Sequence, residues 1–539
     1  SEKNSPSAVY RRSNTDESGY KNFGEIDVWG GTNKNGNITN ITAVNVANGI
    51  AQNGDGTAAN KGTIKVDHGN AIVGTDGSIL SNTKDSEITV TGIYTAGGAA
   101  ISALRTSNGF DATSETAVGP TGNNYGIVGI STKNVRDAYN PNNSKGRYGS
   151  NAVTISNTDG KITVDGDFAT GIYAQNTTYS GDSDAGYNGL AAKQEDVSIT
   201  YSNLQSTSDP TLIKVNTANK VKDNKSARSV GIALDHDNSG TVDNAARRGG
   251  KIFLNTQGKD ISATNEADIL TAHNGIGVYA ESAEIKFGGS SDVKGLNVET
   301  KNRGIGVFVT DDSSIGEATD RVGKSSTKKL YYNYNGDNDS QGYAVAFGST
   351  LNREGTNHTW ATTDATNYLD IEFANSGTTK EGIAGVLVNT DNTDRAINYG
   401  NIKEHSTTVT NEKEYGAVVN RGTFVNYGEI KLNDSLNKNA KDVTADDLKK
   451  VNVGILANDH TKDARYNTFI ENYNDITVGD VTTAGNKNVG NFAIYGYNVK
   501  TGGKSDGSNS IIKISRNNYG IYSGDGNVDI QGTKLFVGN

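Results

Sequence analysis

The chain contains no cysteine, no methionine, only 4 proline residues and no long apolar run. Without cysteine there can be no disulfide, no thiolate metal site and no cysteine nucleophile. No stretch approaches the ~20 apolar residues of a membrane-spanning helix, and no signal peptide is visible. Because the chain starts at Ser1 and lacks methionine, we expect it to be a processed or excised piece of a longer protein.

Apolar residues are also scarce, at 33% of the 539 residues, against roughly 45–50% in a typical globular domain. One large compact core is therefore not expected. Disorder is not expected either, because the apolar residues fall in regular groups of strand length. The formal net charge is -10 and no long basic cluster exists, which argues against binding to nucleic acid or to an anionic membrane surface.

Two short phrases recur along the chain. The first places Gly before alternating small and apolar residues, and its copies are YGIVGI (125–130), TGIYA (170–174), VGIALD (230–235), NGIGVYA (274–280), RGIGVFVT (303–310), EGIAGVLVN (381–389), YGAVVN (415–420), VGILAN (453–458) and YGIYS (519–523). The second is headed by Asn and reads NFGEIDV (22–28), NKGTIKV (60–66), NYGNIK (398–403) and NYGEIKL (426–432). We call them the glycine phrase and the Asn phrase.

Repetition of short strands at a period of about 26–40 residues predicts a solenoid. In elements such as Ile64-Lys65-Val66, apolar residues would point inward and polar residues outward. We therefore predict an all-β, right-handed parallel β-helix with at least two strands per turn. It would form one continuous rod over residues 1–539. The right hand follows from the general preference of parallel crossovers.

The 66 glycine residues suit a chain that turns a corner every few residues. The Asn that heads the second phrase fits either a left-handed corner conformation or a ladder of stacked Asn side chains. Stretches that lack both phrases are predicted to be loop insertions, and these are 105–124, 133–151, 175–195, 204–228, 311–341, 348–368 and 433–452. A short helix is predicted at 444–450, where an N-cap Thr precedes acids and then lysines.

The phrases NYGEIKL, NKGTIKV, GIGVYA and YGIYS resemble those of type V (type Va) autotransporter passengers, and are particularly similar to the large fusobacterial RadD-like outer-membrane adhesins. The resemblance covers nearly the whole chain. It implies a β-helical passenger on the bacterial cell surface, outside the cell, anchored by an outer-membrane β-barrel absent from this chain. It also implies adhesion to a host-cell or bacterial surface protein or glycan by a monomeric rod, with no catalysis. No binding residue can be transferred, because the family has no universal binding motif.

Residues 235–246 match part of an EF-hand calcium loop. Oxygen ligands would come from alternate positions, and Gly240 would supply the sharp turn. Ala246 stands where the bidentate carboxylate should be, so any affinity for calcium would be low, and a polar corner loop is the alternative. The candidate metal ligands are Asp235, Asp237, Ser239, Thr241 and Asp243.

A second candidate site combines aromatic rings with neighbouring carboxylates, which suits sugar stacking or protein contact. The alternative is that the rings pack a loop onto the rod. The residues are Tyr331, Tyr332, Tyr334, Asp337, Asp339 and Trp360.

Two alternatives to adhesion remain open. Parallel β-helices also carry polysaccharide lyases and hydrolases, which need acids on neighbouring turns together with His, Arg or Lys. The chain has only 6 His and lacks the companion phrases of those enzymes. The other alternative is a structural spacer whose parent protein binds its partner elsewhere.

Overall fold

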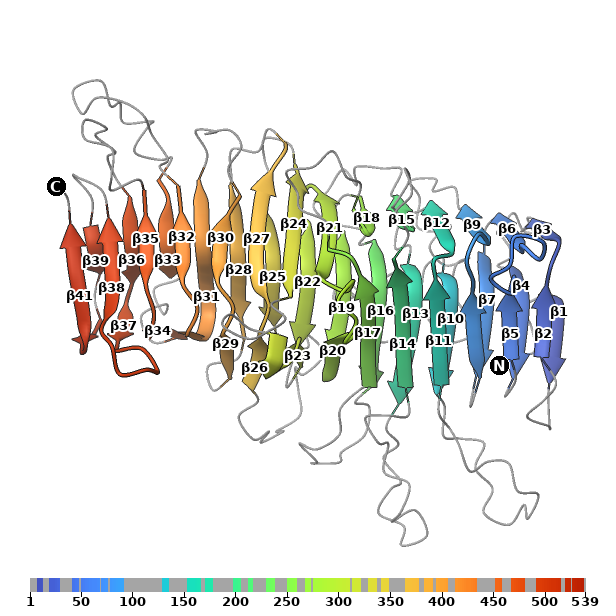
Figure 1. The fold of residues 1–539 in the computed structure, drawn as a ribbon, viewed down its shortest axis with the longest axis horizontal. Coiled ribbons are helices and arrows are strands. Elements are labelled where there is room, and N and C mark those ends of the chain that lie inside the picture. Colours follow the sequence, from blue (N-terminus) through green and yellow to red (C-terminus); the bar gives the residue numbers. More distant parts are fainter. Residues whose placement is uncertain are drawn as a thin grey trace, which may run out of the picture. The chain divides into compact units, whose positions relative to one another are not determined.

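Figure 1 shows the computed structural model of the chain, in which strands dominate the regular structure of the described residues. A 3-10 helix, η3 (Ala318–Asp320), lies among the strands. The residues that the structure describes are 7–12, 19–29, 41–47, 50–67, 69–75, 78–91, 128–134, 153–165, 170–177, 197–204, 212–216, 229–237, 250–258, 267–272, 275–310, 313–320, 328–336, 341–348, 364–377, 382–390, 394–405, 413–433, 451–457, 467–479, 491–514, 519–524 and 526–537.

The described residues divide into two compact units. The first lies within Ser1–Gln257 and Glu266–Val293, and the second within Gly258–Asn265, Lys294–Ser349 and Ala361–Asn539. Each unit contains three stacks of strands, which we call A, B and C.

In the first unit, each strand pairs in parallel with the strand three places further along the chain. Stack A contains β1 (Ser7–Arg12), β4 (Ile41–Ala47), β7 (Gly69–Thr75), β10 (Val128–Asn134), β13 (Thr170–Thr177), β16 (Val230–Asp237) and β19 (Ile276–Glu281). Stack B contains β2 (Gly19–Asn22), β5 (Ile50–Asn53), β8 (Ile79–Asn82), β11 (Val153–Thr158), β14 (Val197–Asn203), β17 (Gly250–Thr256) and β20 (Ala283–Phe287). Stack C contains β3 (Glu25–Trp29), β6 (Thr63–Asp67), β9 (Glu87–Thr91), β12 (Lys161–Asp165), β15 (Ile213–Asn216) and β18 (Ile269–Thr271).

The second unit follows the same plan, again with parallel pairing. Stack A contains β22 (Ile305–Thr310), β25 (Gly342–Gly348), β28 (Ile383–Asn389), β31 (Glu414–Asn426), β33 (Val453–Ala457), β36 (Phe492–Gly496) and β39 (Tyr519–Ser523). Stack B contains β23 (Ser314–Ile315), β26 (Asp364–Asn367), β29 (Arg395–Asn398), the second half of β31, β34 (Thr468–Asn472), β37 (Asn498–Thr501) and β40 (Val528–Ile530). Stack C contains β21 (Gly295–Lys301), β24 (Lys329–Asn335), β27 (Asp370–Asn375), β30 (Ile402–Glu404), β32 (Ile430–Leu432), β35 (Ile476–Val478), β38 (Ser510–Ile514) and β41 (Thr533–Val537).

This order of parallel strands is that of a parallel β-helix, so the predicted fold class is confirmed. One turn, or rung, contributes one strand to each stack. The glycine phrase supplies stack A and the Asn phrase supplies stack C, as β13, β22, β6 and β32 illustrate. The third strand of each rung, in stack B, is not predicted from the sequence because it has no recurring glycine.

The interior is a set of narrow apolar columns. In stack C of the first unit, Ile64, Ile88 and Ile162 occupy equivalent positions on successive rungs and are at most 1% exposed. Full burial of such a side chain is worth ~1.5–3 kcal/mol. A low apolar fraction therefore suffices, since each rung needs only a few inward-facing residues.

Several predicted insertions contain strands, and their boundaries were wrong at these points. β15 lies inside 204–228, β23 and β24 inside 311–341, and β26 inside 348–368. β15 has the Ile-x-Val alternation without either phrase before it. β24 places Tyr332 where β21 has Val298 and β27 has Phe373. The predicted helix at 444–450 lies outside the described residues.

An Asn ladder marks the end of stack B in both units. In the first unit, Asn22 donates to Asn53, Asn53 to Asn82, and Asn82 to Asn157, at 2.8–2.9 Å. The ladder is thus the correct alternative for Asn22. It is wrong for Asn60, whose amide donates instead to Oδ2 of Asp55.

The second unit has the same ladder, formed by Asn367, Asn398, Asn426 and Asn472. Each of these side chains is fully buried.

A column of stacked tyrosine rings accompanies the ladder of the second unit. Tyr368, Tyr399, Tyr427 and Tyr473 each follow a ladder Asn directly, so they leave the corner in the same direction. Their ring centroids are 5.0–5.2 Å apart and their planes differ by at most 15°. This column adds an aromatic contact between rungs outside the interior.

Candidate functional site

The three tyrosines predicted to lie in a binding loop belong instead to strand β24. Tyr331 is 8% exposed, and Tyr332 and Tyr334 are fully buried. The hydroxyl of Tyr332 donates to the carbonyl of Gly304 at 2.8 Å and contacts Oγ1 of Thr300 at 2.7 Å. The prediction of an exposed stacking loop is therefore wrong for these rings. Tyr332 and Tyr334 fill the interior. Tyr331 is in register with Glu372 in an outward-facing position, where the ammonium group of Lys329 lies 5.6 Å from the centre of its ring. Asp337, Asp339 and Trp360 lie outside the described residues.

The candidate calcium loop begins within a strand. Asp235 and Asp237 belong to β16, and their backbone pairs in parallel with Gln175 and Thr177 of β13. An EF-hand loop makes its sharp turn at the glycine of position 6, which here is Gly240 and lies outside the described residues. The calcium loop therefore stays a prediction. Ser239, Thr241 and Asp243 lie outside the described residues. Over the described ranges, no group of three His, Asp or Glu side chains is placed to hold a metal ion.

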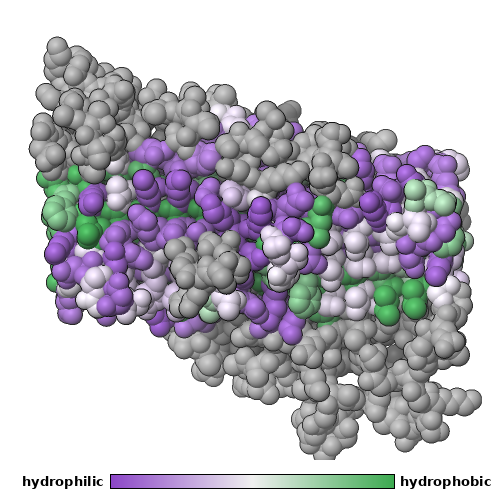
Figure 2. Space-filling model, viewed as in Figure 1, coloured by the Kyte–Doolittle hydropathy of each residue, from purple (hydrophilic) through white to green (hydrophobic). Residues whose placement is uncertain are grey.

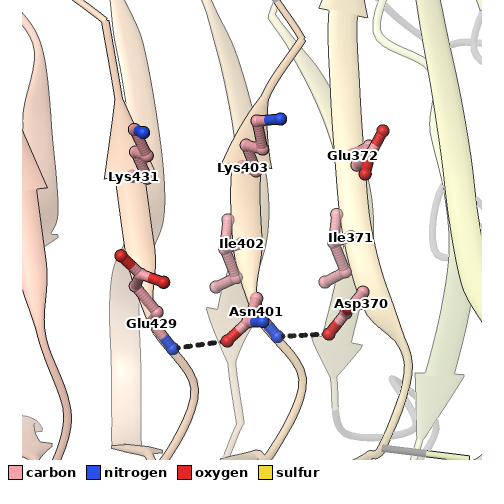
Figure 3. Close-up of a pocket in the computed structure, with 8 residues that line it drawn as sticks. All are labelled: Asp370, Ile371, Glu372, Asn401, Ile402, Lys403, Glu429 and Lys431. Atoms are coloured by element: carbon pink, nitrogen blue, oxygen red, sulfur yellow. Dashed lines mark hydrogen bonds between the residues drawn. The ribbon is translucent and has the colours of Figure 1, made fainter. Parts of the chain in front are cut away.

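A shallow groove lies on the outer face of stack C in the second unit, over three successive rungs (Figure 3). Its cavity volume is about 150 Å³. The lining residues come from β27, β30 and β32 and the residues just before them, and they are Asp370, Ile371, Glu372, Asn401, Ile402, Lys403, Glu429 and Lys431. We call this the stack C groove.

Strand alternation explains how the groove forms. Each rung carries one Ile between two polar residues, as in Asn401-Ile402-Lys403. Ile371, Ile402 and Ile430 face the interior and are fully buried. Their polar neighbours must then face outward, since successive side chains of a strand point to opposite faces. In parallel register the polar residues form two columns along the stack.

The first column links one rung to the next through side-chain oxygens. Oδ1 of Asp370 accepts the backbone N–H of Asn401 at 2.8 Å. Oδ1 of Asn401 in turn accepts the backbone N–H of Glu429 at 2.9 Å, and both bonds are drawn in Figure 3. Burial raises the pKa of Asp370 above its ordinary value, although the Asn401 N–H and the charge of Lys329 oppose that shift.

The second column contains Glu372, Lys403 and Lys431 in register. Nζ of Lys329 lies 2.6 Å from Oε1 of Glu372, and Nδ1 of His405 lies 3.7 Å from Oε2 of the same carboxylate. Glu372 therefore has a cationic partner, Lys329, within the protein. Lys403 and Lys431 are exposed, and neither side chain makes a hydrogen bond or ion pair with the described part of the chain.

The groove thus offers two kinds of chemistry side by side. The exposed ammonium groups of Lys403 and Lys431 are free to meet an anion, whereas Glu429 and Asn401 present groups that can bind hydroxyls. In Figure 3, the ends of Lys403 and Lys431 lie on the same side of their strands. Hydrophilic residues also predominate on the described surface seen in Figure 2.

The sequence analysis does not predict the groove, although four of the polar lining residues lie in phrases that it identifies. Asn401, Lys403, Glu429 and Lys431 belong to two copies of the Asn phrase, NYGNIK and NYGEIKL. The phrase was interpreted only as scaffold. The signal that could have revealed the groove is the sixth position of the Asn phrase, which faces outward and holds Lys in both copies. Stacking of the two rungs would place these like charges next to each other.

Within the described residues, no helix has both the length and the apolar character needed to cross a membrane. No family model, curated protein or solved structure matches the chain.

Proposed function

We propose that the chain is a surface-displayed bacterial adhesin segment. Its β-helix acts as a scaffold, and its outer face and the segments between strands bind a host-cell or bacterial surface receptor or glycan without catalysis. The segment works outside the cell, at the bacterial surface. The resemblance of the glycine and Asn phrases to autotransporter passengers supports this proposal.

The observation that carries the proposal is that some polar side chains join neighbouring rungs whereas others do not. Buried Asn side chains and Asp370 hold rungs together through hydrogen bonds. Lys403 and Lys431, in contrast, make no contact of this kind with the described residues. Exposed charges that do not stabilise the rungs are available to a partner, and a rigid β-helix holds them in fixed relative positions.

The same arrangement favours binding over hydrolysis. A glycosidase needs one carboxyl group as acid and a second as base or nucleophile. In the stack C groove, Asp370 is engaged by a backbone N–H and Glu372 by Lys329, so both have structural partners. Glu429 is the carboxylate of the groove whose side chain is left for a ligand.

A cell-binding assay with the purified chain tests the proposal. Fluorescently labelled protein should bind bacterial or epithelial cells saturably, and excess unlabelled protein should compete. Failure to bind any cell type would favour the spacer alternative. Release of reducing sugars or unsaturated ends from polysaccharides would favour the enzyme alternative and contradict the proposal.

A further inference from the structure

We propose that the stack C groove binds an acidic glycan, with the carboxylate of a sugar acid between Lys403 and Lys431. The hydroxyls of the same sugar bind Glu429 and Asn401. This inference rests on the proposed function and names the ligand class of one site on the scaffold.

The first argument is the pair of lysines. Lys403 and Lys431 are direct partners in the parallel register of β30 and β32. Neighbouring strands lie ~4.8 Å apart, and like charges placed opposite each other destabilise a sheet. Glu372 is the register neighbour of Lys403 on the other side, but its carboxylate is held by Lys329. No described residue makes an ion pair or side-chain hydrogen bond with either ammonium group. An anion placed between them removes this repulsion and gains charge-assisted hydrogen bonds.

The second argument concerns the kind of anion. Glu429 lies two residues before Lys431 on the same outer face, and Asp370 and Glu372 line the same groove. A polyphosphate would be repelled by these carboxylates, whereas a sugar acid brings hydroxyl donors that carboxylates accept. The neighbouring acids therefore favour a carboxylated sugar over a phosphate.

The third argument is size and direction. A cavity of about 150 Å³ is smaller than the ~300 Å³ at which pockets for drug-sized ligands begin. It is suited to one sugar unit. The groove crosses three rungs, so the rest of a glycan chain can continue along the outer face of stack C.

Isothermal titration calorimetry with defined probes tests the inference. The acidic probes are trigalacturonic acid, which carries uronates, and 3′-sialyllactose, which carries a sialate. The controls are lactose and inorganic phosphate. We expect at least one acidic probe to bind, with an affinity that falls as salt is raised, and we expect no binding of lactose.

The double variant Lys403→Gln/Lys431→Gln should bind that probe at least about tenfold more weakly. Lys513→Gln is the matched control, because Lys513 is exposed in the same column on β38 but outside the groove. Its affinity should equal that of the original chain. Thermal melting should show that the double variant folds with unchanged or higher stability, since a like-charge contact is removed.

Unchanged affinity in the double variant would overturn the inference, as would the absence of binding by both acidic probes. Phosphate binding as tight as that of the sugar acids would also overturn it and leave a simple anion site. The cell-binding assay separates these results from failure of the proposed function. If the double variant still binds cells as the original chain does, the adhesin proposal stands and only the acidic-glycan site is lost.

Discussion

Asn398 and Asn426 are joined by a hydrogen bond of 2.9 Å from Nδ2 of the first to Oδ1 of the second, and both side chains are fully buried. The same Nδ2 also donates to the carbonyl of Gly400 at 2.7 Å. Oδ1 of Asn398 accepts from Asn367 at 2.8 Å. A single amide therefore satisfies the corner of its own rung and links it to the rungs on both sides.

Replacing Asn398 with Ala should lower the free energy of unfolding by about 2–4 kcal/mol, because Asn367 keeps a buried donor and Asn426 a buried acceptor without a partner. Chemical denaturation monitored by circular dichroism measures this change. Asn60→Ala is the control, since Asn60 heads an Asn phrase but lies outside the ladder. An equal loss in both variants would mean that the ladder contributes nothing beyond a local corner bond.

The ladder also shows how far the sequence could be interpreted. Period and alternation were sufficient to predict the parallel β-helix and to assign the glycine and Asn phrases to strands. The third stack was missed because its strands, such as Ile50–Asn53 and Arg395–Asn398, share only a terminal Asn. A single polar residue is a weak signal until the stacking of rungs places its copies in contact.

The candidate site was harder to predict for the same reason. Tyr332 and Tyr334 looked like loop aromatics because no phrase precedes them, yet they fill the interior. Lys403 and Lys431 looked like ordinary solvent-facing residues of a repeat. Their significance comes from the register between β30 and β32, which places them side by side. That register can be predicted from the sequence only when the number of residues in each turn is known.

The tyrosine column should contribute to stability through its rings rather than its hydroxyls. Tyr427 stacks on Tyr399 and on Tyr473, and each contact of this kind is worth ~0.5–1.5 kcal/mol. Tyr427→Leu should therefore cost about 1–3 kcal/mol. Tyr427→Phe is the matched control and should cost much less, since it keeps the ring. If both variants unfold at the same denaturant concentration, stacking is not what the column provides.

Glycine in the Asn phrase should be required only where another rung lies against it. A Cβ on Gly428 would overlap the backbone carbonyl of Gly400 and lie 3.1 Å from Nδ2 of Asn398. Gly428→Ala should cost about 1–3 kcal/mol, because neither a paired backbone nor the Asn ladder can shift freely. The control is Gly24→Ala at the same phrase position, where a Cβ would meet nothing within 4 Å. Comparable melting temperatures for the two variants would contradict this account.

The charge of Asp370 should lower the free energy of unfolding at neutral pH. Burial raises the pKa of its carboxyl above the ordinary value, so the folded chain binds this proton more tightly than the unfolded chain does. The stabilising contribution of the protonated Asp370 carboxyl is complete below the ordinary pKa and is lost as the pH rises through the raised pKa. Asp370→Asn keeps an oxygen for the Asn401 N–H, as Asn401 itself does for Glu429. The variant should therefore melt at or above the temperature of the original chain at pH 7, and this advantage should disappear below about pH 4.

Asp506→Asn provides a control of opposite sign. The hydroxyl and backbone N–H of Ser508 donate to Oδ1 of Asp506 at 2.6 and 2.9 Å and lower the pKa of that carboxyl. Its contribution to stability is present above the ordinary pKa and is lost as the pH falls through the lowered pKa. Melting curves from pH 3 to pH 7 should therefore show the stability of Asp506→Asn falling below that of the original chain as the pH rises, while Asp370→Asn gains over the same interval. Parallel pH profiles for the two variants would show that burial does not govern Asp370.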